Sequence, residues 1–265
     1  MSTPTMQYLT VAGSRIELWR GGEGPPLLYL HGAGGAGGWR PHHIALAKHF
    51  DVIAPSHPGF DNSDTPEWLD RVDDLAYCYL ELLAQLKIND VHLVGHSLGG
   101  WVAAELAVRN TSRLKTLSLL AAAGVFVPGP ERVDTFLMSA QARMRAMVHD
   151  PACIEGALAA LANPDNEDTI LKNQMTSARL LWQPRSYSPH LHKWLHLIDI
   201  PTLVLWGASD RVFPLEHADL FCREIPDARK VVIDACGHLI PTEHPQRLVA
   251  EVLAMTQRAD TEAAV

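Results

Sequence analysis

The sequence contains little cysteine and no long apolar run, and both absences limit the classes of protein that it can encode. Its four cysteines stand far apart in the chain, at Cys78, Cys153, Cys222 and Cys236. Without a C-x-x-C pair or dense cysteine spacing, a disulfide-rich scaffold and a cysteine-based zinc site are excluded, and reduced thiols are expected. No stretch approaches the roughly 18 consecutive apolar residues of a transmembrane helix, and residues 1–20 lack the basic and apolar segments of a secretion signal. We therefore expect a cytoplasmic protein that does not enter a membrane.

Positive charge is also scarce and is not clustered. The chain carries 22 lysines and arginines against 30 aspartates and glutamates, for a formal net charge of -8. A nucleic-acid or anionic-lipid partner requires a basic patch, so we exclude both and expect a small-molecule substrate. Hydrophobic residues at 47% and charged residues at 20% are typical of a soluble folded protein. The sequence leaves a monomer and a homodimer open.

Several short apolar runs predict the strands of one sheet. Each is followed closely by glycine, proline or other small residues, which is typical of strands buried on both faces of a parallel sheet. The runs are residues 27–30, 51–54, 91–94, 117–120 and 202–205. Amphipathic stretches separate them, and the clearest, at residues 72–86, has apolar residues at helical spacing and acidic residues near its start. This alternation predicts an α/β fold with a doubly wound, mostly parallel sheet, and residues 8–19 predict an antiparallel hairpin at one edge.

The strand pattern stops between residues 125 and 195. There alanine, leucine, methionine and arginine recur at helical spacing, interrupted by prolines. Beyond them the sequence again predicts sheet elements, with a helix at residues 215–223, a strand at 230–233 and a helix from 245 to about 255. We interpret residues 125–195 as a helical cap, or lid, inserted into a core formed by residues 1–124 and 196–265.

The strongest local motif is Gly95-His96-Ser97-Leu98-Gly99-Gly100, which fits G-x-S-x-G between a predicted strand and a predicted helix. A tight turn in this context exposes the serine at the carboxyl end of the sheet, and glycine is needed where a side chain would collide with neighbouring backbone. The turn also directs the free N–H groups of the following helix at the oxygen of an attacked carbonyl. The motif therefore predicts a nucleophilic serine at Ser97.

A serine nucleophile needs a histidine base, and the base needs a carboxylate that orients it. Asp210 comes just after the predicted strand at residues 202–205, and His238 comes just after the next strand. Carboxyl ends of parallel strands meet at one edge, so both residues are expected beside Ser97, in the chain order Ser, Asp, His. We predict these three as a catalytic triad. The rival carboxylates, which do not follow a strand end in this way, are Asp61, Asp64 and Asp234.

Over nearly its whole length the chain resembles the α/β-hydrolase fold superfamily. Besides residues 95–100, the segments that carry the resemblance are His31-Gly32-Ala33-Gly34-Gly35, Pro58-Gly59-Phe60 with Ser63-Asp64, Trp206-Gly207 with Asp210, and Gly237-His238 with Glu243-His244-Pro245. The resemblance implies that Asp210 orients the base and that His238 is the base. It also implies an oxyanion hole made by the backbone N–H of Leu98 and that of Ala33 or Gly34. The sequence does not separate these last two.

Further residues are candidates for a substrate pocket beneath the cap. They are His31, His96, Trp39, Trp182, Arg179 and Leu239. Structural hydrogen bonds are the competing role for the two histidines, core packing for the tryptophans and simple solvation for the arginine. The remaining histidine groups, His42, His43, His190, His192 and His196, lack carboxylate or cysteine ligands at close spacing, so we expect them to be solvated. We predict no metal and no cofactor.

Serine at the turn, rather than aspartate, argues against the alkyl-enzyme chemistry of haloalkane dehalogenases and epoxide hydrolases. The leading hypothesis is hydrolysis of a carboxylic ester or lactone, with Ser97 as nucleophile. The second is hydrolysis of a carbon–carbon bond in aromatic ring-cleavage products, because residues 31–39 and 56–64 are similar to that family, although Leu239 stands where it usually has tryptophan. A non-catalytic ligand receptor that retains the triad and an acyltransferase are further alternatives.

Overall fold

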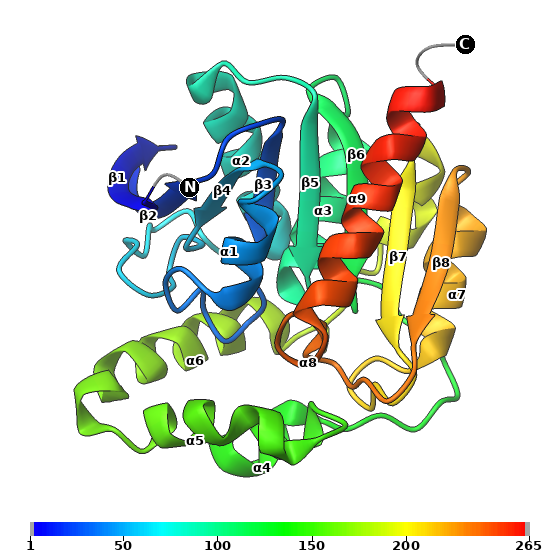
Figure 1. Ribbon diagram of the computed structural model, residues 1–265. Coiled ribbons are helices and arrows are strands. Elements are labelled where there is room, and N and C mark those ends of the chain that lie inside the picture. The colour runs from blue at the N-terminus through cyan, green and yellow to red at the C-terminus, as the bar shows by residue number, and fades with distance from the viewer. Residues whose placement is uncertain (1–2, 263–265) are drawn as a thin grey trace.

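The computed structural model of the chain describes residues 3–262 (Figure 1). Within these residues the strands form one eight-stranded sheet in the order β1-β2-β4-β3-β5-β6-β7-β8. The strands are β1 (Thr5–Val11), β2 (Ser14–Gly21), β3 (Pro26–Leu30), β4 (Asp51–Pro55), β5 (Val91–His96), β6 (Leu114–Leu120), β7 (Thr202–Gly207) and β8 (Ala228–Ile233). β2 pairs antiparallel with β1 and with β4, and the pairs from β4 to β8 are parallel. The expected α/β fold with a mostly parallel sheet is confirmed.

Helices cover both faces of this sheet (Figure 1). α2 (Val72–Leu86) and α3 (Leu98–Arg109) lie behind it in the view shown, whereas α1 (Pro41–Leu46) and α9 (Pro245–Glu262) lie in front. The other helices of the core are α7 (Leu215–Glu224), against β7 and β8, and the short α8 (Ile240–Glu243), which precedes α9. Burial on both faces explains why the parallel strands are continuously apolar in sequence.

The ends of two helices show what local sequence does and does not determine. α2 begins where the pattern predicted, because the Asp74 carboxylate accepts the backbone N–H of Arg71, 2.7 Å away, and caps the first turn. α9 continues to Glu262, beyond the predicted end near residue 255, because Ala259 still lies on a buried face of the helix. A single alanine is a weak apolar signal, so the sequence pattern does not predict where this helix ends.

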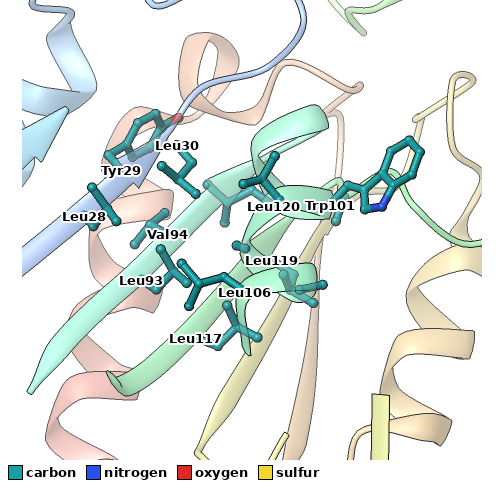
Figure 2. Close-up of a cluster of buried hydrophobic side chains, with 14 of the residues drawn as sticks. Leu28, Tyr29, Leu30, Leu93, Val94, Trp101, Leu106, Leu117, Leu119 and Leu120 are labelled. Atoms are coloured by element: carbon teal, nitrogen blue, oxygen red, sulfur yellow. The ribbon is translucent and has the colours of Figure 1, made fainter. Parts of the chain in front are cut away.

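Large side chains on both faces of the central strands, with two side chains of α3, form the core (Figure 2). The residues labelled there are at most 5% exposed: Leu28, Tyr29 and Leu30 on β3, Leu93 and Val94 on β5, Trp101 and Leu106 on α3, and Leu117, Leu119 and Leu120 on β6. Each such leucine contributes about 1.5–3 kcal/mol through burial. The strand ends that carry the candidate site therefore project from a closely packed platform.

The chain between β6 and β7 is helical. It forms α4 (Ala140–Ala146), α5 (Glu155–Leu161) and α6 (Glu167–Leu181), with short 3-10 turns and, apart from one isolated bridge, no strand within the described residues 121–201. Figure 1 shows these helices below the lower edge of the sheet. We call residues 125–195 the cap segment. None of the helices in residues 3–262 has the length and apolar character needed to cross a membrane.

Candidate active site

The glycine-rich motif forms a tight turn between β5 and α3. Ser97 lies at φ 54° and ψ -113°, a strained backbone conformation for a residue with a side chain. A Cβ atom on Gly95 would lie 2.2 Å from the carbonyl oxygen of Gly99, and one on Gly99 would lie 2.1 Å from that of Leu30. Only glycine fits these two positions, so main-chain packing fixes the turn around the serine.

The turn brings Ser97 together with the residues that follow β7 and β8. Nε2 of His238 lies 2.8 Å from Oγ of Ser97, and Nδ1 of His238 lies 2.9 Å from Oδ2 of Asp210. The histidine is 1% exposed and the aspartate 6% exposed. An Nδ1–H that donates to the carboxylate leaves Nε2 free to accept the serine O–H. The three side chains therefore form one continuous hydrogen-bonded chain in which the histidine can take the serine proton.

The aspartate is fixed by its own turn. Its second oxygen, Oδ1 of Asp210, accepts the backbone N–H groups of Val212 and Phe213 at 2.8 and 3.0 Å. Just before this turn, a Cβ atom on Gly207 would lie 2.2 Å from the carbonyl oxygen of Gly237. The ends of β7 and β8 are thus in close contact, and that contact sets the aspartate beside the histidine.

A main-chain carbonyl of the cap segment and a side chain of β5 hold the turn that carries His238. The carbonyl oxygen of Met147 accepts the backbone N–H of His238 at 2.7 Å and that of Leu239 at 3.2 Å. From the other side, Nε2 of His96 donates to the carbonyl oxygen of His238 at 2.9 Å. His96 and the half-buried Leu239, both proposed from sequence as pocket residues, therefore take part in restraining the peptide that directly follows the histidine.

Glu243 joins the same turn to the cap segment. Its Oε2 accepts the backbone N–H of Gly237 at 2.7 Å, and its Oε1 accepts those of His149 and Asp150 at 2.7 and 3.1 Å. Hydrogen bonds to a carboxylate are stronger than those between neutral groups. One side chain therefore connects the residue before the histidine to the end of the α4 region.

Leu98 and the segment at Gly32 lie next to the serine. Leu98 is the first residue of α3, so its N–H has no acceptor within the helix. A Cβ atom on Gly32 would lie 3.3 Å from Cβ of Ser97, and the Ala33 amide nitrogen is bonded directly to Gly32. Gly34 lies further along the loop, is exposed and would have no atom within 4 Å of an added Cβ. Gly32, the residue before Ala33, is thus in contact with the serine, whereas no such contact is found at Gly34.

His31 orients the peptide between Gly32 and Ala33. Its Nδ1 donates to the carbonyl oxygen of Gly32 at 2.7 Å, and its Nε2 accepts the backbone N–H of His57 at 2.8 Å. Burial lowers the pKa of His31, and it lowers the pKa of His96 to about 3. Both rings are therefore neutral near pH 7, which matches the donor and acceptor roles that their hydrogen bonds require.

The other pocket candidates have partners of their own. The ring of Trp39 lies half-buried, 5.1 Å from that of His43. Trp182 is 50% exposed and packs edge-on against an aromatic ring of the cap segment. Nη2 of Arg179 lies 2.7 Å from Oδ1 of Asp70, in a largely exposed ion pair. None of these three side chains has a hydrogen bond to the triad within residues 3–262.

One group of histidines differs from expectation. His43 is buried rather than solvated, with its ring 4.8 Å from that of Tyr29, and burial lowers its pKa to about 3. Its neighbour His42 is half-buried, also 4.8 Å from the Tyr29 ring, and burial lowers its pKa as well. His43 occupies the inward face of α1, which a helix of six residues is too short to reveal by periodicity. The histidines that are exposed, as expected, are His190, His192 and His196. Across the described part of the chain, no cluster of histidine, cysteine, aspartate and glutamate has the arrangement to hold a metal ion.

Sequence reasoning missed a row of buried polar residues on α6 and the role of one loop aspartate. Asn173, Thr176 and Ser177 are 5–7% exposed. Asp61, considered only as a rival triad acid, accepts the backbone N–H of Ala36 at 2.7 Å in the glycine-rich loop. Polar residues at positions i, i+3 and i+4 of an amphipathic helix are a signal that would have drawn attention to this face.

A hollow of about 450 Å³ opens beside the aspartate turn. Its lining residues are Val148, His149, Ala208, Ser209, Asp210 and Arg211. Of the three residues Ser97, His238 and Asp210, only the aspartate lines this hollow.

Comparison with known proteins identifies the family. The sequence model of the alpha/beta hydrolase family matches residues 27–252. The chain belongs to this family. Among individual alpha/beta hydrolases, it is 30% identical over 284 residues to 2-hydroxy-6-oxo-6-phenylhexa-2,4-dienoate hydrolase of Burkholderia cepacia, with 94% of this chain and 96% of that relative covered.

Solved structures of two hydrolases have the same fold as this alpha/beta hydrolase. A meta-cleavage product hydrolase from Pseudomonas fluorescens superimposes with a TM-score of 0.80 at 25% identity, over 95% of this chain and 98% of the other. Naproxen esterase from Bacillus subtilis superimposes with a TM-score of 0.76 at 20% identity, over 96% and 92% of the two chains. The fold is therefore shared by enzymes that act on different bonds.

Proposed function

We propose that this alpha/beta hydrolase is a serine hydrolase that cleaves carboxylic esters or lactones of medium size and partly apolar character through an acyl-enzyme intermediate. The hydrogen-bonded chain from Ser97 through His238 to Asp210, with distances of 2.8 and 2.9 Å, is the observation that carries the proposal. A positioned base with its own carboxylate is what a serine hydroxyl requires to become a nucleophile at neutral pH.

In the first half of the reaction, Oγ of Ser97 bonds to the ester carbonyl carbon while its proton moves to Nε2 of His238. Asp210 stabilises the resulting imidazolium. The backbone N–H groups of Leu98 and Ala33 stabilise the negative charge on the carbonyl oxygen; we choose Ala33 over Gly34 because of its direct bond to Gly32. The carbon–oxygen bond to the alcohol then breaks, and His238 gives its proton to the leaving oxygen.

In the second half, water attacks the acyl-enzyme. His238 takes a proton from the water as the new bond forms, and it returns that proton to Oγ of Ser97 when the carboxylic acid leaves. In a lactone, the alcohol and the acid remain in one molecule, and the same steps open the ring. The histidine is 1% exposed, so its proton is shared with the reacting groups rather than with bulk water.

We further propose that the cap segment, residues 125–195, covers the substrate and sets its size. Contacts of Met147 and of the His149 amide with the histidine turn support a position next to the triad. We propose a cytoplasmic location, because the four cysteines are free, as reduced thiols would be. The protein is a monomer or a homodimer, and light scattering of the purified protein would distinguish the two.

The second candidate function is carbon–carbon bond hydrolysis of an aromatic ring-cleavage product. The relative from Burkholderia cepacia, whose name is that of a dienoate hydrolase, favours it. A dienoate carries a carboxylate, which a protein site ordinarily matches with arginine. Arg179, the arginine that the sequence suggested for the pocket, already forms an ion pair with Asp70, and Arg185 forms one with Asp134.

Arg143 is a partly buried cation of the cap segment that we propose for such a carboxylate. It lies on α4, one turn before Ala146 and Met147, on the face of the helix that is turned inward. Within residues 3–262 it forms no ion pair, and burial lowers its pKa. If the protein cleaves a dienoate, Arg143→Gln should raise KM for that substrate at least about tenfold, without a comparable effect on neutral esters.

The test is turnover of a panel of p-nitrophenyl esters, lactones and a 2-hydroxy-6-oxo-dienoate by the wild-type protein and by Ser97→Ala. We expect ester or lactone turnover that exceeds dienoate turnover and is lost in Ser97→Ala by about 10³-fold or more. Faster turnover of the dienoate would replace the leading function with the second. No turnover, together with tight ligand binding, would favour a receptor, and transfer to an added alcohol rather than water would favour an acyltransferase.

A further inference from the structure

The cap segment contacts the glycine-rich loop through one face of α6. Asn173, Thr176 and Ser177 occupy positions i, i+3 and i+4 of that helix and are almost fully buried. Buried polar side chains persist in proteins when each has a hydrogen-bond partner. Here all three side chains donate to main-chain carbonyl oxygens in loops of the core.

Two of these hydrogen bonds reach the loop that supplies the proposed oxyanion amide. Oγ of Ser177 donates to the carbonyl oxygen of Ala33 at 2.7 Å, and Nδ2 of Asn173 donates to that of Gly34 at 3.2 Å. Thr176 lies between them on the helix but points to a different loop, and its Oγ1 donates to the carbonyl oxygen of Gly59 at 2.7 Å.

Asp61 strengthens the same attachment. Asn173 accepts the backbone N–H of Asp61 at 2.8 Å and donates to its Oδ1 at 3.0 Å, while Oδ2 of Asp61 accepts the N–H of Ala36 at 2.7 Å. Burial raises the pKa of Asp61, but attraction to His31 and these hydrogen bonds outweigh burial, and the net pKa lies below the ordinary value. The carboxylate is therefore charged near pH 7 and ties the end of the loop to Asn173.

The loop needs such an external restraint. Residues 32–38 contain five glycines, and glycine has more backbone freedom than any other residue. Gly35 adopts φ 94°, and a Cβ atom there would lie 2.4 Å from Nδ2 of Asn173, so glycine is what allows the helix side chain to approach. The carbonyl oxygens of Ala33 and Gly34 belong to the two planar peptides that follow the Ala33 amide. Holding them leaves only the two dihedral angles of Ala33 between its amide and a restrained peptide, and so limits how far that amide can turn.

We propose that Ser177 and Asn173 of the cap segment are positioning residues for the oxyanion hole. They restrain the chain immediately after the Ala33 amide and so keep that amide directed at the attacked carbonyl oxygen, whereas the triad is assembled without them. This inference rests on the proposed function. It implies that displacement of α6 impairs the oxyanion hole and leaves the hydrogen bonds between Ser97, His238 and Asp210 intact.

The experiment compares Ser177→Ala with the matched control Thr176→Val. The two residues are neighbours on α6, are similarly buried and each donate one 2.7 Å hydrogen bond to a core carbonyl, but only Ser177 reaches the oxyanion loop. We expect Ser177→Ala to lower kcat for a p-nitrophenyl ester about tenfold or more, to weaken inhibition by a boronic acid by a similar factor, and to leave KM and the pH profile of kcat/KM unchanged. Each variant loses one buried hydrogen bond, so both should lower Tm by similar amounts. In Thr176→Val, however, kcat should stay within about twofold of wild type.

Hydrogen exchange of the amides of residues 33–36 tests the inference whatever the substrate is. Ser177→Ala should accelerate exchange there, and Asn173→Ala should accelerate it further, whereas Thr176→Val should accelerate exchange near Gly59 only. Unchanged exchange at residues 33–36 in a folded Ser177→Ala protein, or an equal loss of kcat in Thr176→Val, would overturn the inference. Absence of Ser97-dependent turnover in the wild-type protein would instead contradict the proposed function.

Discussion

The two sides of the proposed active site are held by different kinds of contact. On the nucleophile side, main chain packs against main chain, and Gly95 and Gly99 leave no room for a side chain. On the oxyanion-loop side, Ser177 and Asn173 reach loop carbonyls that lie 144 and 139 residues away in sequence. Contact between main chains demands glycine and is visible in the sequence. Contact through distant side chains uses ordinary polar residues and is not.

The substitution with the largest expected effect disrupts the main-chain packing on the nucleophile side. Gly99→Ala places a Cβ atom 2.1 Å from the carbonyl oxygen of Leu30, where only backbone movement relieves the overlap. We expect the free energy of unfolding to fall by about 4 kcal/mol or more, measured by urea denaturation. Gly156→Ala, with no atom within 4 Å of the added Cβ on exposed α5, is the control and should be neutral or stabilising by up to about 1 kcal/mol. A wild-type urea midpoint for Gly99→Ala would contradict this packing explanation.

A smaller effect is expected where the nucleophile side itself depends on a side chain. Glu243→Gln keeps the shape of the side chain but turns one acceptor oxygen into an N–H₂ group that faces N–H donors. We expect a loss of about 2 kcal/mol in unfolding free energy, together with reduced kcat because the His238 turn is less restrained. Glu224→Gln, which disrupts a surface ion pair with Arg223, should change stability by less than about 0.5 kcal/mol. Equal effects of the two substitutions would show that the hydrogen bonds of Glu243 do not stabilise the His238 turn.

The third prediction concerns stability at acid pH and depends on His43, which lies on α1, the helix that follows the oxyanion loop. Burial lowers the pKa of His43 to about 3, so the unfolded chain binds a proton that the folded chain does not between roughly pH 6.5 and 3. Stability due to this residue is therefore lost as the pH falls through that range. His43→Gln should reduce the slope of unfolding free energy against pH by up to about 1.4 kcal/mol per unit between about pH 6 and 4. An unchanged slope would show that His43 is protonated in the folded protein.

The smallest expected effect measures strain at the nucleophile itself. Ser97 has a positive φ of 54°, which costs energy for any residue with a Cβ atom. Ser97→Gly and Ser97→Ala both remove the hydroxyl, but only the glycine variant relieves the strain. We expect the glycine variant to be the more stable of the two by about 1 kcal/mol in urea denaturation. An alanine variant of equal or greater stability would mean that the turn stores no strain at this position.

The sequence predicted the fold well because its signals are local. Apolar runs mark the strands, and the rule that parallel strands share their carboxyl edge explains why Asp210 and His238 lie next to Ser97. The glycine motif also predicted the turn, since main-chain crowding there tolerates no other residue. These inferences needed no knowledge of which distant segments touch.

The remainder depended on contacts that no local pattern encodes. Arg179 was considered for a substrate carboxylate, but it meets Asp70, 109 residues away. His43 was expected in solvent, but packing against Tyr29 buries it. The attachment of α6 to the oxyanion loop is of the same kind, because each serine or asparagine in a helix has many polar partners open to it until the fold selects one.

The contact between Met147 and the histidine turn bears on how enzymes of this fold diversify. The acceptor of the His238 and Leu239 amides is a carbonyl oxygen, and every amino acid supplies one. The side chain at position 147 can therefore change under selection for a new substrate without loss of these two hydrogen bonds. Positions 173 and 177 lack this freedom, so a cap transplanted from another hydrolase would have to bring its own matching pair to work on this core.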